Sequence, residues 1–190
     1  MAKLRMPAAQ EVAMSRKLNF AIFILMVQAI AAPANATSNP PAAFDQLKTL
    51  VGEWEGQNSA GAVKATYTLA SGGTVLMERL KSANEPEMIT MYSADGDHIV
   101  VTHYCSAGNQ PQMTSAALLG KPQKFSFSLV RVTGMKTQAE GHMVGLVLSI
   151  VDKDHLTQEW KYQANGKVSA DLFRLKRKLE PPASVVAPSS

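Results

Sequence analysis

The alternation of apolar and polar residues changes its period once, shortly after residue 50. Residues 43–50 read AFDQLKTL and place apolar residues at helical spacing, which predicts one short amphipathic helix. Beyond Gly52 the period becomes two, as in residues 63–70, VKATYTLA, where every second residue is apolar. This spacing is typical of strands that are buried on one face.

Ten segments carry the strand pattern, and short turns separate most of them: 52–57, 63–70, 74–81, 88–93, 98–105, 112–120, 124–132, 141–152, 155–162 and 167–178. Every connection is too short for a crossover helix, so neighbouring strands must be antiparallel. A long antiparallel meander tends to close, because closure removes its exposed edges. We therefore predict an all-β fold, an antiparallel up-and-down β-barrel of about ten strands with one short N-terminal helix. A β-sandwich is the alternative.

The start of the predicted domain resembles a known group of barrels. The order of its elements, a helix followed by LVGEWEG at residues 50–56 and then by a meander, is similar to that of the calycins (lipocalins and fatty-acid-binding proteins). The similarity is greatest to uncharacterised exported bacterial proteins of this type. The resemblance implies that Trp54 opens the first strand and that Arg174, on the last strand, packs over its indole to close one barrel end. The start also resembles that of the haem-binding nitrobindins, but Gln57 and Asn58 stand where those have a further glycine.

The N-terminal residues have the three parts of a secretory signal. Arg16 and Lys17 precede an apolar run that ends in Ala34-Asn35-Ala36, so cleavage is predicted after Ala36. A membrane anchor is the alternative, although the run is only about as long as the shortest spanning helices and contains polar residues. We expect export to the bacterial periplasm or the extracellular space, with no stable membrane anchor after cleavage.

These features divide the chain into four parts: a signal peptide at 1–36, a flexible linker at 37–42, a calycin-like barrel at 43–178 and a disordered tail at 179–190. The whole chain has 19 basic and 15 acidic residues, but residues 37–190 have 15 and 14. This near balance excludes the basic field that nucleic-acid binding needs. The single cysteine, Cys105, excludes an internal disulfide.

Strand alternation also predicts which polar side chains face the lumen. In residues 74–81, Arg79 and Lys81 indicate the outer face, which places Glu78 inside. In residues 98–105, the more apolar face carries His103 and Cys105. The same reasoning yields the full set of candidate ligand-binding residues: Tyr67, Glu78, His103, Cys105, Gln158 and Tyr162. We expect His103 to lie near Glu78, and residues 108–111 to form a loop at the barrel mouth.

A mostly apolar lumen with a few polar groups is typical of a small-ligand pocket. We therefore predict an exported protein that binds a small apolar or amphipathic molecule. Three alternatives stay open: a filled barrel with a structural or interaction role, a haem-binding barrel with His103 as axial ligand, and an enzyme that uses Glu78 and His103 as acid and base. The four histidines and one cysteine do not have a zinc-site spacing, so no metal, catalytic residue or resident cofactor is assigned.

Overall fold

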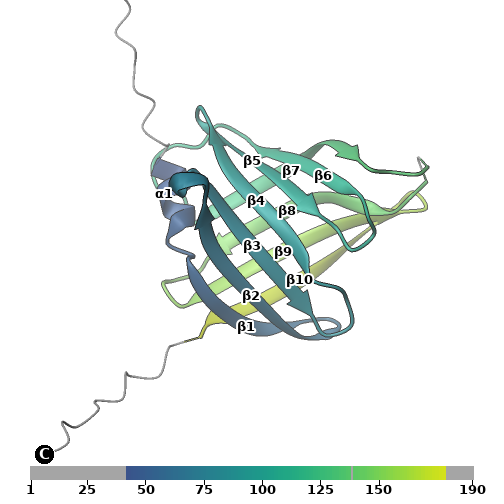
Figure 1. The fold of residues 1–190 in the computed structure, drawn as a ribbon, viewed down its shortest axis with the longest axis horizontal. Coiled ribbons are helices and arrows are strands. Elements are labelled where there is room, and N and C mark those ends of the chain that lie inside the picture. Colours follow the sequence, from purple (N-terminus) through teal and green to yellow (C-terminus); the bar gives the residue numbers. More distant parts are fainter. Residues whose placement is uncertain (1–41, 138, 179–190) are drawn as a thin grey trace, which may run out of the picture. The chain divides into compact units, whose positions relative to one another are not determined.

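The computed structural model describes residues 42–137 and 139–178, and these form a closed antiparallel barrel preceded by one short helix (Figure 1). The helix α1 spans Ala42–Lys48. The strands are β1 Gly52–Asn58, β2 Gly61–Ala70, β3 Val75–Ser82, β4 Met88–Asp95, β5 His98–Tyr104, β6 Gln110–Ser115, β7 Lys124–Thr133, β8 His142–Ile150, β9 His155–Ala164 and β10 Lys167–Arg177. Each strand pairs with its neighbours in sequence, and β1 pairs with β10 to close the barrel. The predicted fold class is confirmed.

Several sequence predictions fall on residues outside this description. They stay predictions: the signal peptide at 1–36, the linker as far as residue 41, and the tail at 179–190. Ala42, which was predicted to belong to the linker, begins α1. Within residues 42–137 and 139–178, no helix is long and apolar enough to span a membrane.

The sixth strand differs from its predicted bounds. β6 begins at Gln110, so the predicted loop at 108–111 is wrong by two residues, and the strand ends at Ser115 rather than 120. The turn before it is tight, because the Cys105 amide donates to the Asn109 carbonyl. Proline in a strand is tolerated here because Pro111 lies just beyond the β5–β6 ladder, which joins residues 100–102 to residues 112–114.

One glycine is required where the barrel closes. A Cβ atom at Gly56 would lie 1.9 Å from the Arg174 carbonyl oxygen on β10. Only glycine therefore allows β1 and β10 to approach this closely. The closing register that results places Trp54 opposite Arg177 and Gln57 opposite Arg174.

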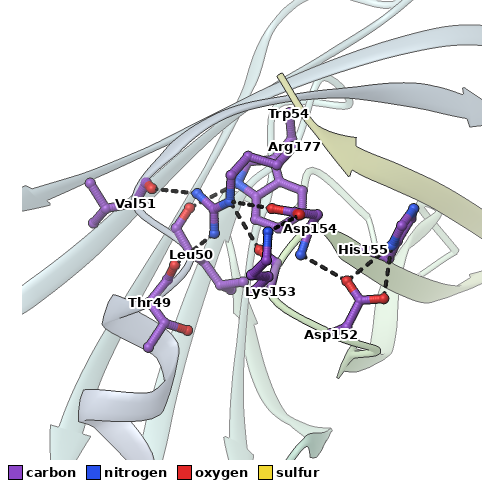
Figure 2. Close-up of polar contacts among 9 residues, drawn as sticks. All are labelled: Thr49, Leu50, Val51, Trp54, Asp152, Lys153, Asp154, His155 and Arg177. Carbon is purple, nitrogen blue, oxygen red and sulfur yellow. Dashed lines mark hydrogen bonds and ion pairs between the residues drawn. The ribbon is translucent and has the colours of Figure 1, made fainter. Parts of the chain in front are cut away.

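This register corrects the predicted closure of the barrel end. Arg177, not Arg174, stacks on Trp54, with the guanidinium carbon 4.3 Å from the ring centroid (Figure 2). Arg174 lies three residues earlier, and an odd offset along a strand reverses the face, so its side chain is exposed on the outside. The resemblance was right about the type of contact and wrong about the residue that makes it.

Arg177 also ties the helix–strand connection to the barrel. Its guanidinium donates to the carbonyl oxygens of Val51 and Thr49, each at 2.8 Å, and to that of Lys153 at 3.0 Å (Figure 2). The Trp54 indole donates to the Leu50 carbonyl at 2.8 Å.

The helix and this cluster close one end of the barrel. Ala43, Phe44 and Leu47 of α1 are buried in the same core as Trp54. Since the strands alternate in direction, the turns that follow β1, β3, β5, β7 and β9 lie at the other end. That second end has no covering helix among the described residues, and it holds the candidate site.

Candidate functional site

A cavity of about 440 Å³ occupies the end of the barrel opposite α1. Its walls are mainly apolar and come from five strands: Leu80, Met88, Met143, Trp160 and Phe173 contribute to them. His103, Cys105 and Tyr162 also line the cavity, and the turns after β1, β3 and β5 form its rim. The cavity thus combines apolar walls with a small number of polar side chains.

A buried polar network lies deeper in the barrel, around Glu78. The hydroxyl of Tyr67 donates to Oε1 of Glu78 at 2.8 Å, and that of Tyr92 donates to Oε2 at 2.8 Å. The Gln158 amide donates both to Glu78 and to the Tyr67 hydroxyl, the latter at 2.5 Å. Gln158 in turn accepts a hydrogen bond of 2.7 Å from the Trp160 indole. Every member of this network is less than 3% exposed.

The strand register explains why these residues meet. Tyr67, Glu78, Thr90 and His103 stand directly opposite one another on β2, β3, β4 and β5. Residues in register on neighbouring strands point to the same face, so the four side chains form one row across the inner wall.

The network keeps its protons on the tyrosines. Burial, followed by the proximity of Glu78, raises the pKa values of Tyr67 and Tyr92 well above the usual value. Burial also raises the pKa of Glu78, while hydrogen bonds from Gln158, Tyr92, Tyr67 and Thr90 act in the opposite direction. Burial thus favours the neutral carboxyl of Glu78, and the donors around it favour the carboxylate.

The structure divides the six candidate residues into two groups. Tyr67, Glu78 and Gln158 are satisfied by one another inside the barrel and do not line the cavity. His103, Cys105 and Tyr162 do line it. His103 was expected to lie near Glu78: the two stand in the same row of the inner wall, with Thr90 between them in the register, and His103 contacts Thr90.

His103 is the polar group that distinguishes the cavity. It is 1% exposed, its ring centroid lies 4.6 Å from that of Trp160, and its Nδ1 is 3.0 Å from the Thr90 hydroxyl. Its Nε2 is buried and has no hydrogen-bond partner among the described residues. Burial lowers the pKa of His103 to about 4, so the imidazole is neutral at physiological pH.

Cys105 and Tyr162 are half-buried beside it. The Tyr162 hydroxyl lies against Gly141, where an added Cβ would be 1.9 Å from it. At the rim, Asp171 holds the β1–β2 turn by accepting hydrogen bonds from the Asn58 amide at 2.9 Å and the Ser59 backbone at 3.2 Å.

Sequence reasoning missed Thr90, Tyr92 and the role of Trp160. In residues 88–93, MITMYS, both faces are largely apolar, so alternation alone could not say which face is buried. Trp160 shares a strand face with Gln158, and that spacing was the available signal.

The acid–base hypothesis for Glu78 and His103 gains no support from this geometry. Both Glu78 oxygens are already bonded inside the barrel, away from the cavity. Among the described residues, no cluster of three or more histidine, cysteine or acidic side chains could hold a metal ion.

The buried imidazole predicts a pH-dependent stability. Unfolded His103 binds a proton near pH 6.5 but folded His103 only near pH 4, so its contribution to stability falls as the pH drops through this window. From pH 7 to pH 4 the wild type should lose about 3 kcal/mol more unfolding free energy than His103→Gln. Urea unfolding at both pH values measures this difference. The exposed His155→Gln is the matched control, and a His103→Gln variant that loses as much as the wild type would contradict the burial of a neutral imidazole.

Comparison with known proteins supports the barrel and assigns no family. No family model and no curated protein matches the chain. Among solved structures, Rv2717c from M. tuberculosis is similar, with 12% identity and a TM-score of 0.55 over 74% of this chain and 100% of that one. A protein of unknown function from the DUF3598 family of Nostoc punctiforme PCC 73102 has 17% identity and a TM-score of 0.48; the similarity covers 70% of this chain and 48% of that one. At such identities, the likeness to Rv2717c shows a shared barrel fold alone.

Proposed function

We propose that this protein is a calycin-like barrel that binds a small apolar or amphipathic molecule in the cavity at its open end. The observation that carries the proposal is a cavity of about 440 Å³ with mainly apolar walls and a few polar side chains, His103 among them. Apolar walls with a few polar side chains are the usual lining of a small-molecule site. The volume falls within the usual range for small-molecule sites, about 300–1,000 Å³.

The alternative of a filled barrel accounts for only part of the interior. The network around Glu78 fills the middle of the barrel with satisfied polar groups. It does not account for the space lined by Met88, Met143 and Phe173 next to His103. The interior therefore favours a barrel that is filled in its middle by the polar network and has a binding site at the end opposite α1.

Haem fits this cavity less well than an uncharged molecule does. His103 lines the cavity within apolar walls, and an imidazole is a common axial ligand of haem iron. However, haem also carries two propionate groups, and the charged side chains that line the cavity are Glu85 and Asp171, with no lysine or arginine among the described lining residues. Two carboxylates at the rim oppose two carboxylates on the ligand, so haem is not assigned.

A fluorescence titration tests the proposed function. N-phenyl-1-naphthylamine, an uncharged dye, should bind the wild type with one site per chain. Ala107→Trp, in the turn that lines the cavity, should weaken binding about tenfold or more by filling the mouth. Val130→Trp, on the exposed outer wall, is the control and should bind as the wild type does. A wild type that does not bind the dye, or an equal effect of both substitutions, would overturn the proposal.

Export, which residues 1–36 predict, would place this binding in the periplasm or outside the cell. The calycin relationship is supported by the helix, by the Gly52-x-Trp54 start and by an arginine of the last strand stacked on the tryptophan.

A further inference from the structure

The charges around the cavity are unbalanced. Two carboxylates line it, those of Glu85 and Asp171, and the described lining residues include no lysine or arginine. Lys81 lies close by in sequence, but its ammonium donates to the Glu85 backbone carbonyl and is not part of the lining. The lining of the cavity therefore carries a net negative charge.

Neither carboxylate has a cation of the protein as its partner. Within residues 42–137 and 139–178, no ion pair joins Glu85 or Asp171 to a lysine, an arginine or a histidine. Asp171 accepts hydrogen bonds from the Asn58 side-chain amide at 2.9 Å and from the Ser59 backbone at 3.2 Å, and both donors are neutral. These bonds hold the carboxylate at the mouth of the cavity without cancelling its charge, and a cationic ligand would supply the missing counter-charge.

The strand register places Asp171 among aromatic side chains. Asp171 stands opposite Trp160 on β9, and Ser169, two residues earlier on β10, stands opposite Tyr162. Residues two apart on a strand point to the same face, so Asp171, Trp160 and Tyr162 share the inner wall. All three line the cavity. Trp160 is almost fully buried, whereas Asp171 and Tyr162 are only half-buried, so a ligand at the mouth can touch both.

A carboxylate beside an aromatic ring is suited to an organic ammonium ion. The carboxylate supplies the opposite charge, and the electron-rich face of the phenol ring attracts the cation as well. Behind this pair, Leu80, Met88 and Met143 provide apolar walls for the rest of such a ligand. The cavity thus has an acidic, aromatic mouth and an apolar interior.

We infer that the ligand is an amphiphilic cation, an organic amine in its ammonium form, whose charged end lies between Asp171 and Tyr162 and whose apolar part fills the cavity. This inference rests on the proposed binding function and narrows its ligand class. An uncharged molecule gains only the contact with the apolar walls. An anionic amphiphile is excluded, because its carboxylate would lose hydration beside two like charges without gaining a counter-ion.

Three naphthalenes that differ in their end group test this inference. At pH 7, 2-naphthylmethylamine is a cation, 2-naphthylmethanol is uncharged and 2-naphthylacetate is an anion. Each is used to displace N-phenyl-1-naphthylamine from the full chain at low ionic strength, where charge interactions are least screened. We expect the amine to bind about tenfold more tightly than the alcohol, as one ion pair at the rim and one cation–π contact together predict. The acetate should bind more weakly than the alcohol.

Two substitutions of equal charge show where the preference arises. Asp171→Asn keeps the size of the side chain but removes its charge, so the preference for the amine over the alcohol should fall to about threefold or less. Its affinity for the alcohol should stay within about twofold of the wild type. Glu159→Gln is the matched control, because it removes the same charge from the outer face of β9, where Glu159 lies 3.8 Å from Lys161. This variant should keep the full preference.

The outcomes separate this inference from the proposed function. If the dye binds but the amine competes no better than the alcohol, the ligand class is wrong and the binding site stands. If Asp171→Asn and Glu159→Gln lower the preference equally, Asp171 is not the counter-ion and the inference fails. If the dye does not bind the wild type, both proposals fail.

A second measurement uses the wild type alone, so it does not depend on a variant that folds. The trimethylammonium derivative of 2-naphthylmethylamine is added to the ¹³C-labelled protein, and intermolecular NOEs from its methyl protons are recorded. These methyl protons should give NOEs to the ring protons of Tyr162 at the mouth. Their absence would overturn the inference, because the charged end would then lie away from the acidic, aromatic mouth.

Discussion

Replacing Trp54 with alanine should lower the free energy of unfolding by about 3–5 kcal/mol, the usual loss for a large buried aromatic. Trp54 is 1% exposed, packs edge-on against Tyr67 and lies under the guanidinium of Arg177. Its removal would leave a cavity where α1 and β1 join the barrel, and would free the Leu50 carbonyl that its indole binds. Chemical denaturation of the wild type and the variant measures the loss.

Two arginines on β10 provide the matched control. Arg177→Ala removes the cation–π contact and three hydrogen bonds to backbone carbonyls, and should cost about 1–2 kcal/mol. Arg174→Ala, on the exposed outer face, should cost about 0.5 kcal/mol or less. A larger loss for Arg174→Ala than for Arg177→Ala would contradict the closing register, and a loss below about 0.5 kcal/mol for Trp54→Ala would contradict the closure itself.

Glu78→Leu should lower the free energy of unfolding by about 3 kcal/mol or more. The substitution keeps the volume but removes the acceptor shared by Tyr67, Tyr92 and Gln158, all of them buried. Each donor left without a partner costs about 1–3 kcal/mol, and release of the buried carboxylate offsets part of the sum. Urea denaturation at pH 7 measures the change.

Removal of an orphaned donor should restore stability. Adding Tyr92→Phe to Glu78→Leu should recover about 1 kcal/mol, because the Tyr92 hydroxyl donates to Glu78 and an apolar replacement of both partners is far less costly than loss of one. Tyr67 is kept, since its hydroxyl still accepts from Gln158. Glu87→Ala breaks only an exposed ion pair with Arg79 and should change stability by about 0.5 kcal/mol or less. If Tyr92→Phe lowers stability further, the Tyr92 hydroxyl does not depend on Glu78 as the network requires.

The architecture could be predicted because it depends on local patterns. The strands show a period of two, and short turns such as Asp95-Gly96-Asp97 and Asn165-Gly166 join them. A long antiparallel meander of such strands tends to close, because closure removes its exposed edges, so a barrel can be predicted without knowledge of any long-range contact. The inward facing of Glu78 followed from Arg79 and Lys81 on the opposite face of its strand, and that of His103 followed from the apolar residues on its own strand face. Both side chains are buried, as alternation predicted.

The register between β1 and β10 could not be predicted from the sequence, because these two strands come from opposite ends of the barrel domain. No local pattern says whether Trp54 faces Arg174 or Arg177, and an error of three residues exchanges the inner and outer faces. The close approach at Gly56 selects the observed pairing, and this is a property of two backbones in contact.

The division of the lumen into a polar network and a cavity was likewise decided only by the tertiary structure. Whether a buried polar side chain is satisfied depends on neighbours from several strands: Glu78 finds Tyr67, Tyr92 and Gln158, whereas Nε2 of His103 finds no described partner. Strand alternation therefore identified the residues that point inward. Only the packing of ten strands around them determined which ones bond to each other and which ones line the cavity.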